Sequence, residues 1–357
     1  MTLDILQQRL QNQLLSQTKF TQASQVVAWL GAVQSQDYAG AKWAVAQRTN
    51  GLTDAAIEQA FADGEILRTH VLRPTWHFVT PADIRWLLRL TAPRVRALLA
   101  FLDRQLEVER TLINQTNTIL AKALKGGKHS TRAELGSVLQ GNGIETNGLR
   151  LGHIVMHAEL DGILCSGARR GKQFTYAFLE ERVPQTKTLE RDEALAELAK
   201  RYFRSHGPAT LKDFVWWSGL TMADARKGMD FVKPQFEQEM IERQTYWFAP
   251  SQPVRGPSPT AFLLPNYDEY TVGYTDRGAI FDGSHADQLP RESTLAQSIL
   301  IDGRMTGLWR RTLKKNEVVI ELTPFTLPTD EQKQAMITAT QQYGKFVELP
   351  VVLTNAA

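Results

Sequence analysis

The chain has 357 residues, of which 43% are hydrophobic and 22% charged, a balance typical of folded domains that excludes disordered and fibrous classes. Its apolar runs are far shorter than the roughly 20 residues that a membrane-spanning helix needs, and no signal-peptide pattern opens the sequence. Cys165 is the only cysteine, which excludes disulfide frameworks and thiolate zinc clusters. We therefore expect a cytoplasmic protein of several compact units, with no membrane partner, no metal and no cofactor.

Charge is unevenly distributed, although the net charge is only +3. Residues 1–180 contain 20 Lys and Arg against 15 Asp and Glu, whereas the remaining residues contain 21 against 23. Between Arg68 and Arg132 there are twelve basic and four acidic residues. Such a stretch attracts a polyanion over a Debye length of ~8 Å, although a solvated helix face has a similar composition. The charge pattern by itself is compatible with nucleic acid as a partner but is also what an ordinary solvated surface shows.

Three similar stretches begin at Thr21, Thr131 and Thr210, and an amphipathic helix is expected before each of them, at 3–15, 111–124 and 191–205. Glu134 and Asp213 follow two of these threonines at the spacing of a capping box, which predicts a helix start. A third helix and strands come next in each stretch. The helices are expected at 53–62, 147–159 and 221–232, and the strands around Val71 and Phe78, at 163–165, at 175–178 and at 240–248. This repeat of roughly 80 residues predicts three winged-helix units in series.

After Pro257 the sequence changes to short strands with turn signals. We expect strands at 263–264, on both sides of Asp302-Gly303 and at 318–322, a helix at 330–343 and a last strand at 346–353. The Pro-rich segment 250–259 marks a boundary. The predicted fold class is therefore α+β, with three tandem winged-helix units followed by a small C-terminal β-barrel-like domain. The predicted boundaries are 1–103, 104–184, 185–256 and 257–357.

Two glutamines, Gln34 and Gln36, lie where a helix gives way to Gly-containing backbone. Because alternate side chains of extended backbone point to one side, the two amides form a polar pair that can hold a water or a sugar oxygen. The structural alternative is that they satisfy backbone groups at a helix end. Asp37 is either a helper carboxylate or the N-cap of the next helix. The candidate catalytic residues are Gln34, Gln36 and Asp37.

Candidate DNA contacts are basic and polar residues of predicted loops and their surroundings, together with one tyrosine that either stacks on a base or packs in the interior. They are Tyr38, Lys42, Arg48, Arg68, Arg73, Thr75, His77, Arg169, Arg170 and Lys172. For His77 a partly buried structural histidine is the alternative. The last three residues also fit a solvated hairpin tip.

Two other patterns are weak evidence for a metal site or for nucleotide hydrolysis. His153 and His157 lie four residues apart on a predicted helix, but the Glu of the zinc-protease pattern is absent, and we predict no metal there. The run 126–129 is similar to a phosphate-binding loop but lacks its first Gly and its final Ser or Thr, which argues against nucleotide hydrolysis.

Four segments, 34–43, 73–77, 213–220 and 302–310, resemble the AlkZ-like winged-helix DNA glycosylases, and the resemblance covers nearly the whole chain. It implies three tandem winged helices and a C-terminal β-barrel around a concave DNA-binding channel. Characterised members of the family excise alkylated purines, some of them from interstrand crosslinks. The resemblance places the first β-hairpin of the family, which lies near DNA, at residues around Arg73, Thr75 and His77.

The catalytic motif of the family is Gln, an apolar residue, and then Gln or Asp, which corresponds here to Gln34, Ser35 and Gln36. The resemblance thus predicts a DNA-repair hydrolase that cleaves the N-glycosidic bond of purines alkylated at N3 or N7 in double-stranded DNA. Alkylation makes the base a good leaving group, so two Gln side chains that position water and stabilise an oxocarbenium-like sugar suffice. Ser35 departs from the apolar centre of the motif. The alternative is a non-catalytic winged-helix DNA-binding protein or transcriptional regulator, and no protein partner is predicted.

Overall fold

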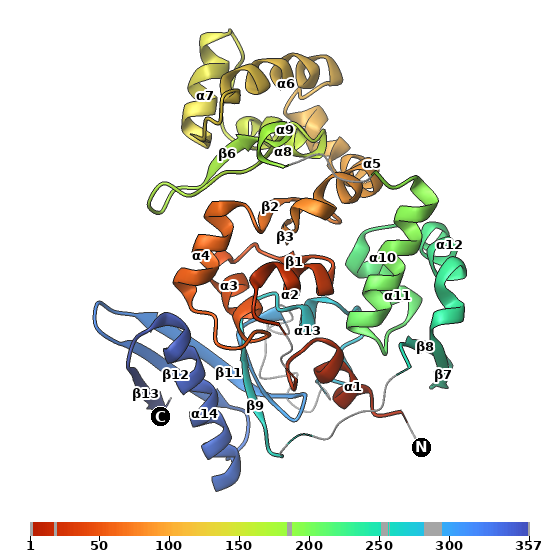
Figure 1. Cartoon of the computed structure of the whole chain (residues 1–357), viewed down its shortest axis with the longest axis vertical. Helices are drawn as coiled ribbons and strands as arrows, with labels where there is room; N and C mark the ends of the chain where they lie inside the picture. The colour runs from red at the N-terminus through yellow and green to blue at the C-terminus, as the bar shows by residue number, and fades with distance from the viewer. Residues whose placement is uncertain are drawn as a thin grey trace.

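The structure is a computed structural model that describes residues 3–17, 20–183, 188–250, 256, 258–281 and 295–355. The chain forms an elongated α+β molecule in which residues 106–183 make the upper lobe and the C-terminal sheet lies at the opposite end (Figure 1). In the described part of the chain, no helix is both long and apolar enough to cross a membrane.

Within the described residues, the first part of the chain places five helices around a small antiparallel sheet. Its elements are α1 (Ile5–Asn12), α2 (Ala23–Leu30), β1 (Val33–Gln34), α3 (Tyr38–Ala46), α4 (Asp54–Asp63), β2 (Leu67–His70), β3 (Trp76–Val79) and α5 (Pro81–Gln105). The strand order is β1-β3-β2, so β1 lies at an edge of this sheet. Helix α5 has 25 residues, begins with Pro81 in its first turn, and was not predicted from the sequence.

The second part repeats helices followed by a three-stranded sheet of order β4-β6-β5. Its elements are α6 (Arg110–Leu124), β4 (Ser130–Thr131), α7 (Arg132–Gly141), α8 (Arg150–Leu160), β5 (Leu164–Ser166), β6 (Thr175–Phe178) and α9 (Leu179–Arg182). The predicted capping box is confirmed, because the Thr131 hydroxyl accepts from the Glu134 N–H and the Glu134 carboxylate accepts from the Thr131 N–H. The capping pair therefore starts α7 where the sequence predicts it.

The third part has three helices and a two-stranded hairpin. Its elements are α10 (Arg191–His206), α11 (Leu211–Ser218), α12 (Met222–Val232), the short 3-10 helix η1 (Lys233–Gln235), β7 (Glu237–Ile241) and β8 (Gln244–Phe248). Thr210 and Asp213 form the second predicted capping box at the start of α11. The helix ends at Gly219, whose φ of 70° is the left-handed conformation that glycine adopts without strain.

The C-terminal part is one five-stranded sheet with α14 packed against it (Figure 1). Its elements are β9 (Ala261–Leu264), α13 (Glu269–Val272), β10 (Ser298–Ile301), β11 (Arg304–Leu313), β12 (Val318–Pro324), α14 (Asp330–Val347) and β13 (Val351–Asn355). The order β13-β12-β11-β10-β9 leaves β9 and β13 as edges, so the expected barrel-like closure is not confirmed among the described residues. The Asp302-Gly303 turn is confirmed, with both φ angles positive. The predicted last strand starts too early, because α14 continues to Val347. Most of the predicted linker, 250–259, lies outside the described residues.

The hydrophobic cores are shared between parts that are distant in sequence. One cluster joins Leu87 of α5, Leu198 of α10 and Leu300 of β10. A second joins α2–α4 to the C-terminal sheet and α14. The third is confined to the upper lobe, between Val108 and Tyr176. Packing between distant segments therefore fixes the position of the glutamine segment relative to the third and C-terminal parts.

Candidate functional site

The glutamine segment lies on the edge strand β1. Helix α2 ends at Gly31, whose φ of 84° turns the chain out of the helix, and the next residues pair with β3. Gln34 is opposite His77 in this pairing, and the Ser35 N–H donates to the Trp76 carbonyl at 2.7 Å. The motif thus runs alongside the loop that joins β2 to β3.

The two amides are oriented by donors from this loop. Gln34 Oε1 accepts from an Arg73 guanidinium nitrogen at 2.8 Å, and Gln36 Oε1 accepts from the Trp76 N–H at 3.2 Å. Both partners can only donate, so the amide oxygens face the loop and the amino groups face away. Within the described residues neither amino group has a hydrogen-bond partner. Gln34 is 7% exposed and Gln36 is exposed, so the pair offers N–H donors at the edge of the protein.

Ser35 lies between the glutamines and is completely buried. Its carbonyl accepts from the Nε and Nη2 groups of Arg68, each at 3.2 Å. Its hydroxyl has no hydrogen-bond partner in the part of the chain that the structure describes. The middle position of the motif therefore packs against the interior, which explains why its side chain differs from the flanking pair.

Glu269, which was not among the predicted site residues, holds the backbone of the motif. Its buried carboxylate accepts from the Gln34 N–H at 2.8 Å, the Trp217 indole at 2.8 Å and His206 Nε2 at 3.3 Å. Burial alone would raise the pKa of Glu269, but the hydrogen bonds from His206 and the Gln34 N–H, together with the electrostatic interaction with His206, outweigh burial and lower it. An anionic carboxylate therefore links β1 to α11 and α13.

Asp37 is the N-cap of α3, which is one of the two roles predicted for it. Its Oδ1 accepts from the Gly40 N–H at 3.0 Å. Its Oδ2 lies 3.3 Å from the Asn266 amide nitrogen and 3.9 Å from Arg311. The carboxylate thus fixes the turn that follows the glutamines.

His77 and Arg48 are corrections to the predicted DNA contacts. His77 is completely buried, and burial next to Arg73 lowers its pKa to about 3, so a neutral ring is held inside the protein. Arg48 is also completely buried and makes two hydrogen bonds to Asp268, at 2.7 and 2.9 Å. Neither side chain can reach DNA in this structure.

Other predicted contacts are already paired with carboxylates. Lys42 is almost buried and bonds to Asp54 and Glu58, each at 2.8 Å. Arg169 pairs with Glu58 at 3.2 Å, and Arg170 pairs with Glu134 at 2.6 Å. These intramolecular pairs leave the three cations less available for phosphate than the sequence indicates.

The remaining predicted contacts differ in exposure. Tyr38 packs edge-on against Phe174 at 4.9 Å, and burial raises the pKa of its hydroxyl. Lys172 is exposed at the hairpin tip. Thr75 is half-buried beside Arg73, and its carbonyl lies 3.0 Å from His77 Nδ1.

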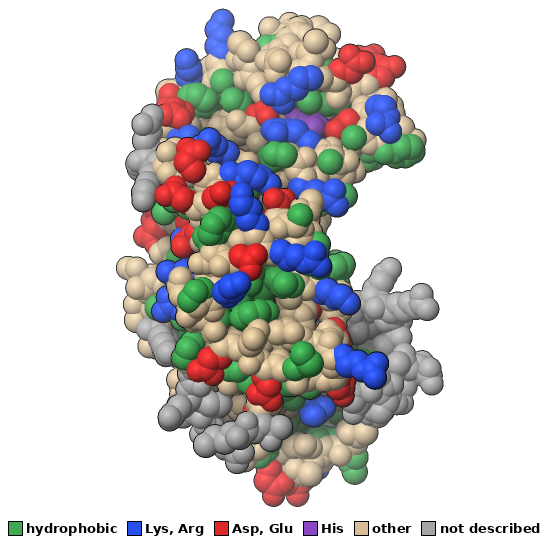
Figure 2. Space-filling model, turned by 90° about the vertical axis from the view of Figure 1, so that its right-hand side faces the viewer, with side chains coloured by type: hydrophobic (Ala, Val, Ile, Leu, Met, Phe, Trp, Pro, Cys, Tyr) green, Lys and Arg blue, Asp and Glu red, His purple; other side chains and the backbone are tan. Residues whose placement is uncertain are grey.

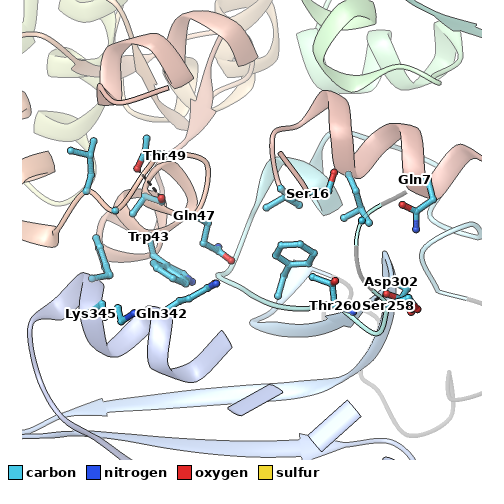
Figure 3. A pocket seen from close by; sticks show the side chains of 18 of the residues that line it. Gln7, Ser16, Trp43, Gln47, Thr49, Ser258, Thr260, Asp302, Gln342 and Lys345 are labelled. Atoms are coloured by element: carbon cyan, nitrogen blue, oxygen red, sulfur yellow. Dashed lines mark hydrogen bonds between the residues drawn. The ribbon is translucent and has the colours of Figure 1, made fainter. Parts of the chain in front are cut away.

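Two cavities lie near these elements. One, of about 580 Å³, brings together five predicted site residues and the C-terminal part of the chain; the predicted residues are Gln36, Asp37, Tyr38, Lys42 and Arg169. The other, of about 640 Å³, lies between α1, α3, the sheet and α14, with Trp43, Gln47 and Lys345 in its wall (Figure 3). The larger cavity contains none of the predicted catalytic residues.

Four arginines and two tryptophans flank the glutamines, and we call them the Arg–Trp cluster: Arg68, Arg73, Arg132, Arg277, Trp76 and Trp216. The guanidinium carbons of Arg68 and Arg132 lie 4.1 and 5.8 Å from the Trp76 ring centre. Those of Arg73 and Arg277 lie 5.8 and 5.7 Å from the Trp216 ring centre. Gln34 is therefore bonded to Arg73 in the half around Trp216, and Gln36 is bonded to Trp76 in the other half.

In the part of the chain that the structure describes, none of the four arginines of this cluster takes part in an ion pair. Among the described residues, no carboxylate oxygen lies within 4.0 Å of any of the four guanidinium groups. Burial lowers the pKa of Arg68 to about 10 and also lowers the pKa of Arg73 and Arg277. Because unpaired cations are costly to desolvate, such a cluster is suited to a polyanionic partner. Figure 2 shows Lys and Arg side chains over the middle of the molecule, beside a recess below the upper lobe.

One group of side chains has donor atoms suited to a metal ion. The carboxylate of Asp103 lies 3.0 Å from a ring nitrogen of His153 and 3.0 Å from one of His157. The three ligand atoms lie within 4.8 Å of one another, and the group ties α5 to α8 in the upper lobe. The same distances fit two neutral imidazoles that donate to one carboxylate.

Comparisons with known proteins agree with this geometry. Residues 27–346 match the family described as DNA glycosylase AlkZ-like. An interstrand DNA cross-link repair glycosylase from Streptomyces sahachiroi is 25% identical over 334 residues, which cover 89% of this chain and 88% of that protein. The solved structure of the Streptomyces sahachiroi DNA glycosylase AlkZ has a TM-score of 0.81 and 23% identity, covers 98% of both chains, and has the same fold. Because the family match covers most of its length, this chain belongs to the AlkZ-like DNA glycosylase family.

Proposed function

We propose that this protein hydrolyses the N-glycosidic bond of purines alkylated at N3 or N7 in double-stranded DNA, with Gln34 and Gln36 at the sugar of the damaged nucleoside. The observation that carries the proposal is the pair of oriented amides between the two halves of the Arg–Trp cluster. The name of the Streptomyces sahachiroi relative adds crosslinked DNA to the candidate substrates. We further propose that the three units of helices and hairpin are winged helices with the boundaries predicted above.

The amides supply the two functions that this reaction needs. An amino group that donates to a water oxygen holds that water near the anomeric carbon and leaves a lone pair free for attack. An amide oxygen stabilises the positive charge that develops on the sugar. The Gln34 oxygen is bonded to Arg73 without DNA, so Arg73 has to move to a phosphate before this oxygen can face the sugar. We assign Asp37 a supporting role, because its carboxylate caps α3.

The main DNA contacts in this proposal are arginines that have no carboxylate partner among the described residues, whereas Arg169 and Arg170 would have to give up Glu58 and Glu134 to bind phosphate. Of the predicted contacts, Arg68 and Arg73 belong to this group. The further contacts lie on the β2–β3 and β5–β6 hairpins: Thr75, Arg169, Arg170 and Lys172. Arg132 is an additional proposed contact. In the sequence it was marked only by its position at the end of the basic stretch 68–132. These residues hold the phosphate backbone, which fixes the register of the duplex without reading its sequence.

Release of 7-methylguanine from a methylated duplex tests the proposal. In single-turnover reactions we expect Gln34→Ala and Gln36→Ala to lose about 10²- to 10³-fold in rate, by analogy with the loss of one charge-stabilising donor. Their affinity for undamaged duplex should not change. Gln59→Ala is the matched control, because Gln59 is an exposed glutamine on α4 of the same part of the chain. Unchanged rates in both variants would remove the glutamines from the mechanism, and sequence-dependent binding without base release would favour the regulator.

A further inference from the structure

We infer that Trp216, Arg277 and Arg73 form a phosphate-binding site for the DNA strand that passes Gln34. The inference rests on the proposed function and adds two residues, Trp216 and Arg277, to the DNA-binding surface. It also assigns Arg73 the role of a switch between Gln34 and the phosphate.

The Trp216 indole is exposed and yet fixed in position. Trp216 and Trp217 are consecutive on α11, but Trp217 is completely buried and donates to Glu269, whereas Trp216 is 42% exposed. The Trp216 indole N–H donates to the Val272 carbonyl at 2.9 Å. A large apolar ring that stays at the surface in a single orientation is typical of a binding site.

The two guanidinium groups beside this ring have unused donors. Arg277 donates through Nε to the Thr271 carbonyl at 2.8 Å, while its Nη2 is buried and has no partner in the described residues. Asp213 is a nearby carboxylate, but its oxygens already accept from Thr210 and from the Thr275 N–H, at 2.9 Å each. Among the described residues neither cation has a carboxylate at ion-pair distance, and Glu269 and Asp213 act on Arg73 and Arg277 only from further away.

Gly219 explains how residues distant in sequence meet here. It ends α11 with a positive φ, and a Cβ atom at this position would lie 2.3 Å from the Leu72 carbonyl oxygen. Only glycine allows the end of α11 to approach the residue before Arg73 so closely. The packing of α11 on the β2–β3 loop therefore places Trp216 next to Arg73.

A phosphodiester fits this arrangement better than a carboxylate or a neutral base. Its oxygens can accept from both planar guanidinium groups at once, and its charge relieves the repulsion between them. The adjoining sugar can pack against the indole. Arg73 also donates to Gln34 Oε1, so a phosphate that binds Arg73 would release the amide oxygen. Binding of the strand would thus complete the catalytic pair only when DNA is present.

Binding of undamaged duplex at increasing salt concentration tests the site without any need for base excision. We expect Arg277→Gln to lower the slope of log affinity against log salt by about one, as expected for one lost phosphate contact. Trp216→Ala should weaken binding about tenfold at low salt, and Trp216→Phe should restore part of the loss. Arg304→Gln is the control, because Arg304 is an exposed arginine at the start of β11 that has no ion pair among the described residues.

The outcomes separate this inference from the proposed function. Wild-type slope and affinity in both Arg277→Gln and Trp216→Ala, with tight binding by the wild type, would overturn the phosphate site alone. Absence of wild-type binding even at low salt would overturn both proposals. Arg277→Gln keeps the test decisive if Trp216→Ala fails to fold, because the Arg277 side chain is only half-buried.

Discussion

At the scale of single residues, the orientation of each amide follows from the donors around it. Arg73 and the Trp76 N–H select the oxygen of each glutamine, and Glu269 holds the backbone N–H of Gln34. The sequence predicts the pair from its spacing, but the donors come from a loop about 40 residues further along the chain. The residue types were therefore predictable, whereas the partner that blocks the Gln34 oxygen was not.

Ser35 provides a test at this scale. Its buried hydroxyl has no hydrogen-bond partner in the described part of the chain, and an unsatisfied buried group destabilises the folded state. Ser35→Ala should therefore raise the free energy of unfolding by about 1 kcal/mol and leave base release unchanged. Urea unfolding and the single-turnover assay measure the two quantities. A large loss of excision in Ser35→Ala would mean that the hydroxyl acts in the reaction.

At the scale of secondary-structure elements, local sequence signals correctly predicted the starts of two helices and one hairpin turn. The threonine capping boxes begin α7 and α11, and Asp302-Gly303 turns between β10 and β11. Local signals failed where tertiary packing decides: the expected barrel-like closure is not confirmed, and α5 was not predicted. The availability of basic side chains was not predictable either, because their carboxylate partners are distant in sequence. Arg48, for example, pairs with a residue 220 positions away.

The Arg48–Asp268 pair connects the end of α3 to the start of α13. Both side chains are completely buried, so removal of one partner leaves an uncompensated charge. We expect Arg48→Ala to lower the free energy of unfolding by about 3–5 kcal/mol. At a temperature where the variant remains folded, its affinity for DNA should stay close to that of the wild type. A selective loss of affinity without a loss of stability would instead restore Arg48 as a DNA contact.

At the scale of the whole molecule, the first, third and C-terminal parts meet around buried titratable groups. His77, His206 and Glu269 are all completely buried, and each has a lowered pKa. The shared hydrophobic cluster that surrounds this junction draws on α5, α10 and the C-terminal sheet. The same contacts that hold the parts together therefore hold the glutamine segment, and conditions that loosen the junction should affect both.

Acid stability tests this junction. The pKa of His77 is about 3 in the folded protein and about 6.5 in the unfolded chain, so the unfolded state binds more protons as the pH falls below 6.5. Stability is therefore complete above pH 6.5 and declines toward pH 3. At pH 5.5 we expect His77 to account for a loss of about 1 kcal/mol relative to pH 7.5. Urea unfolding at both pH values should show this loss in the wild type and less of it in His77→Gln. Equal pH dependence in the two proteins would contradict a buried neutral His77.

The structure of a complex with DNA tests the central claim most directly. A duplex that carries a 2′-fluorinated 7-methylguanosine suits it, because the fluorine opposes positive charge on the sugar and slows cleavage. We predict that the Gln34 and Gln36 amides lie within about 3.5 Å of the sugar of this nucleoside or of a water that faces its anomeric carbon. We also predict that Arg73 has moved from Gln34 to a phosphate. A modified nucleoside bound away from both glutamines, with Arg73 still on Gln34, would contradict the account.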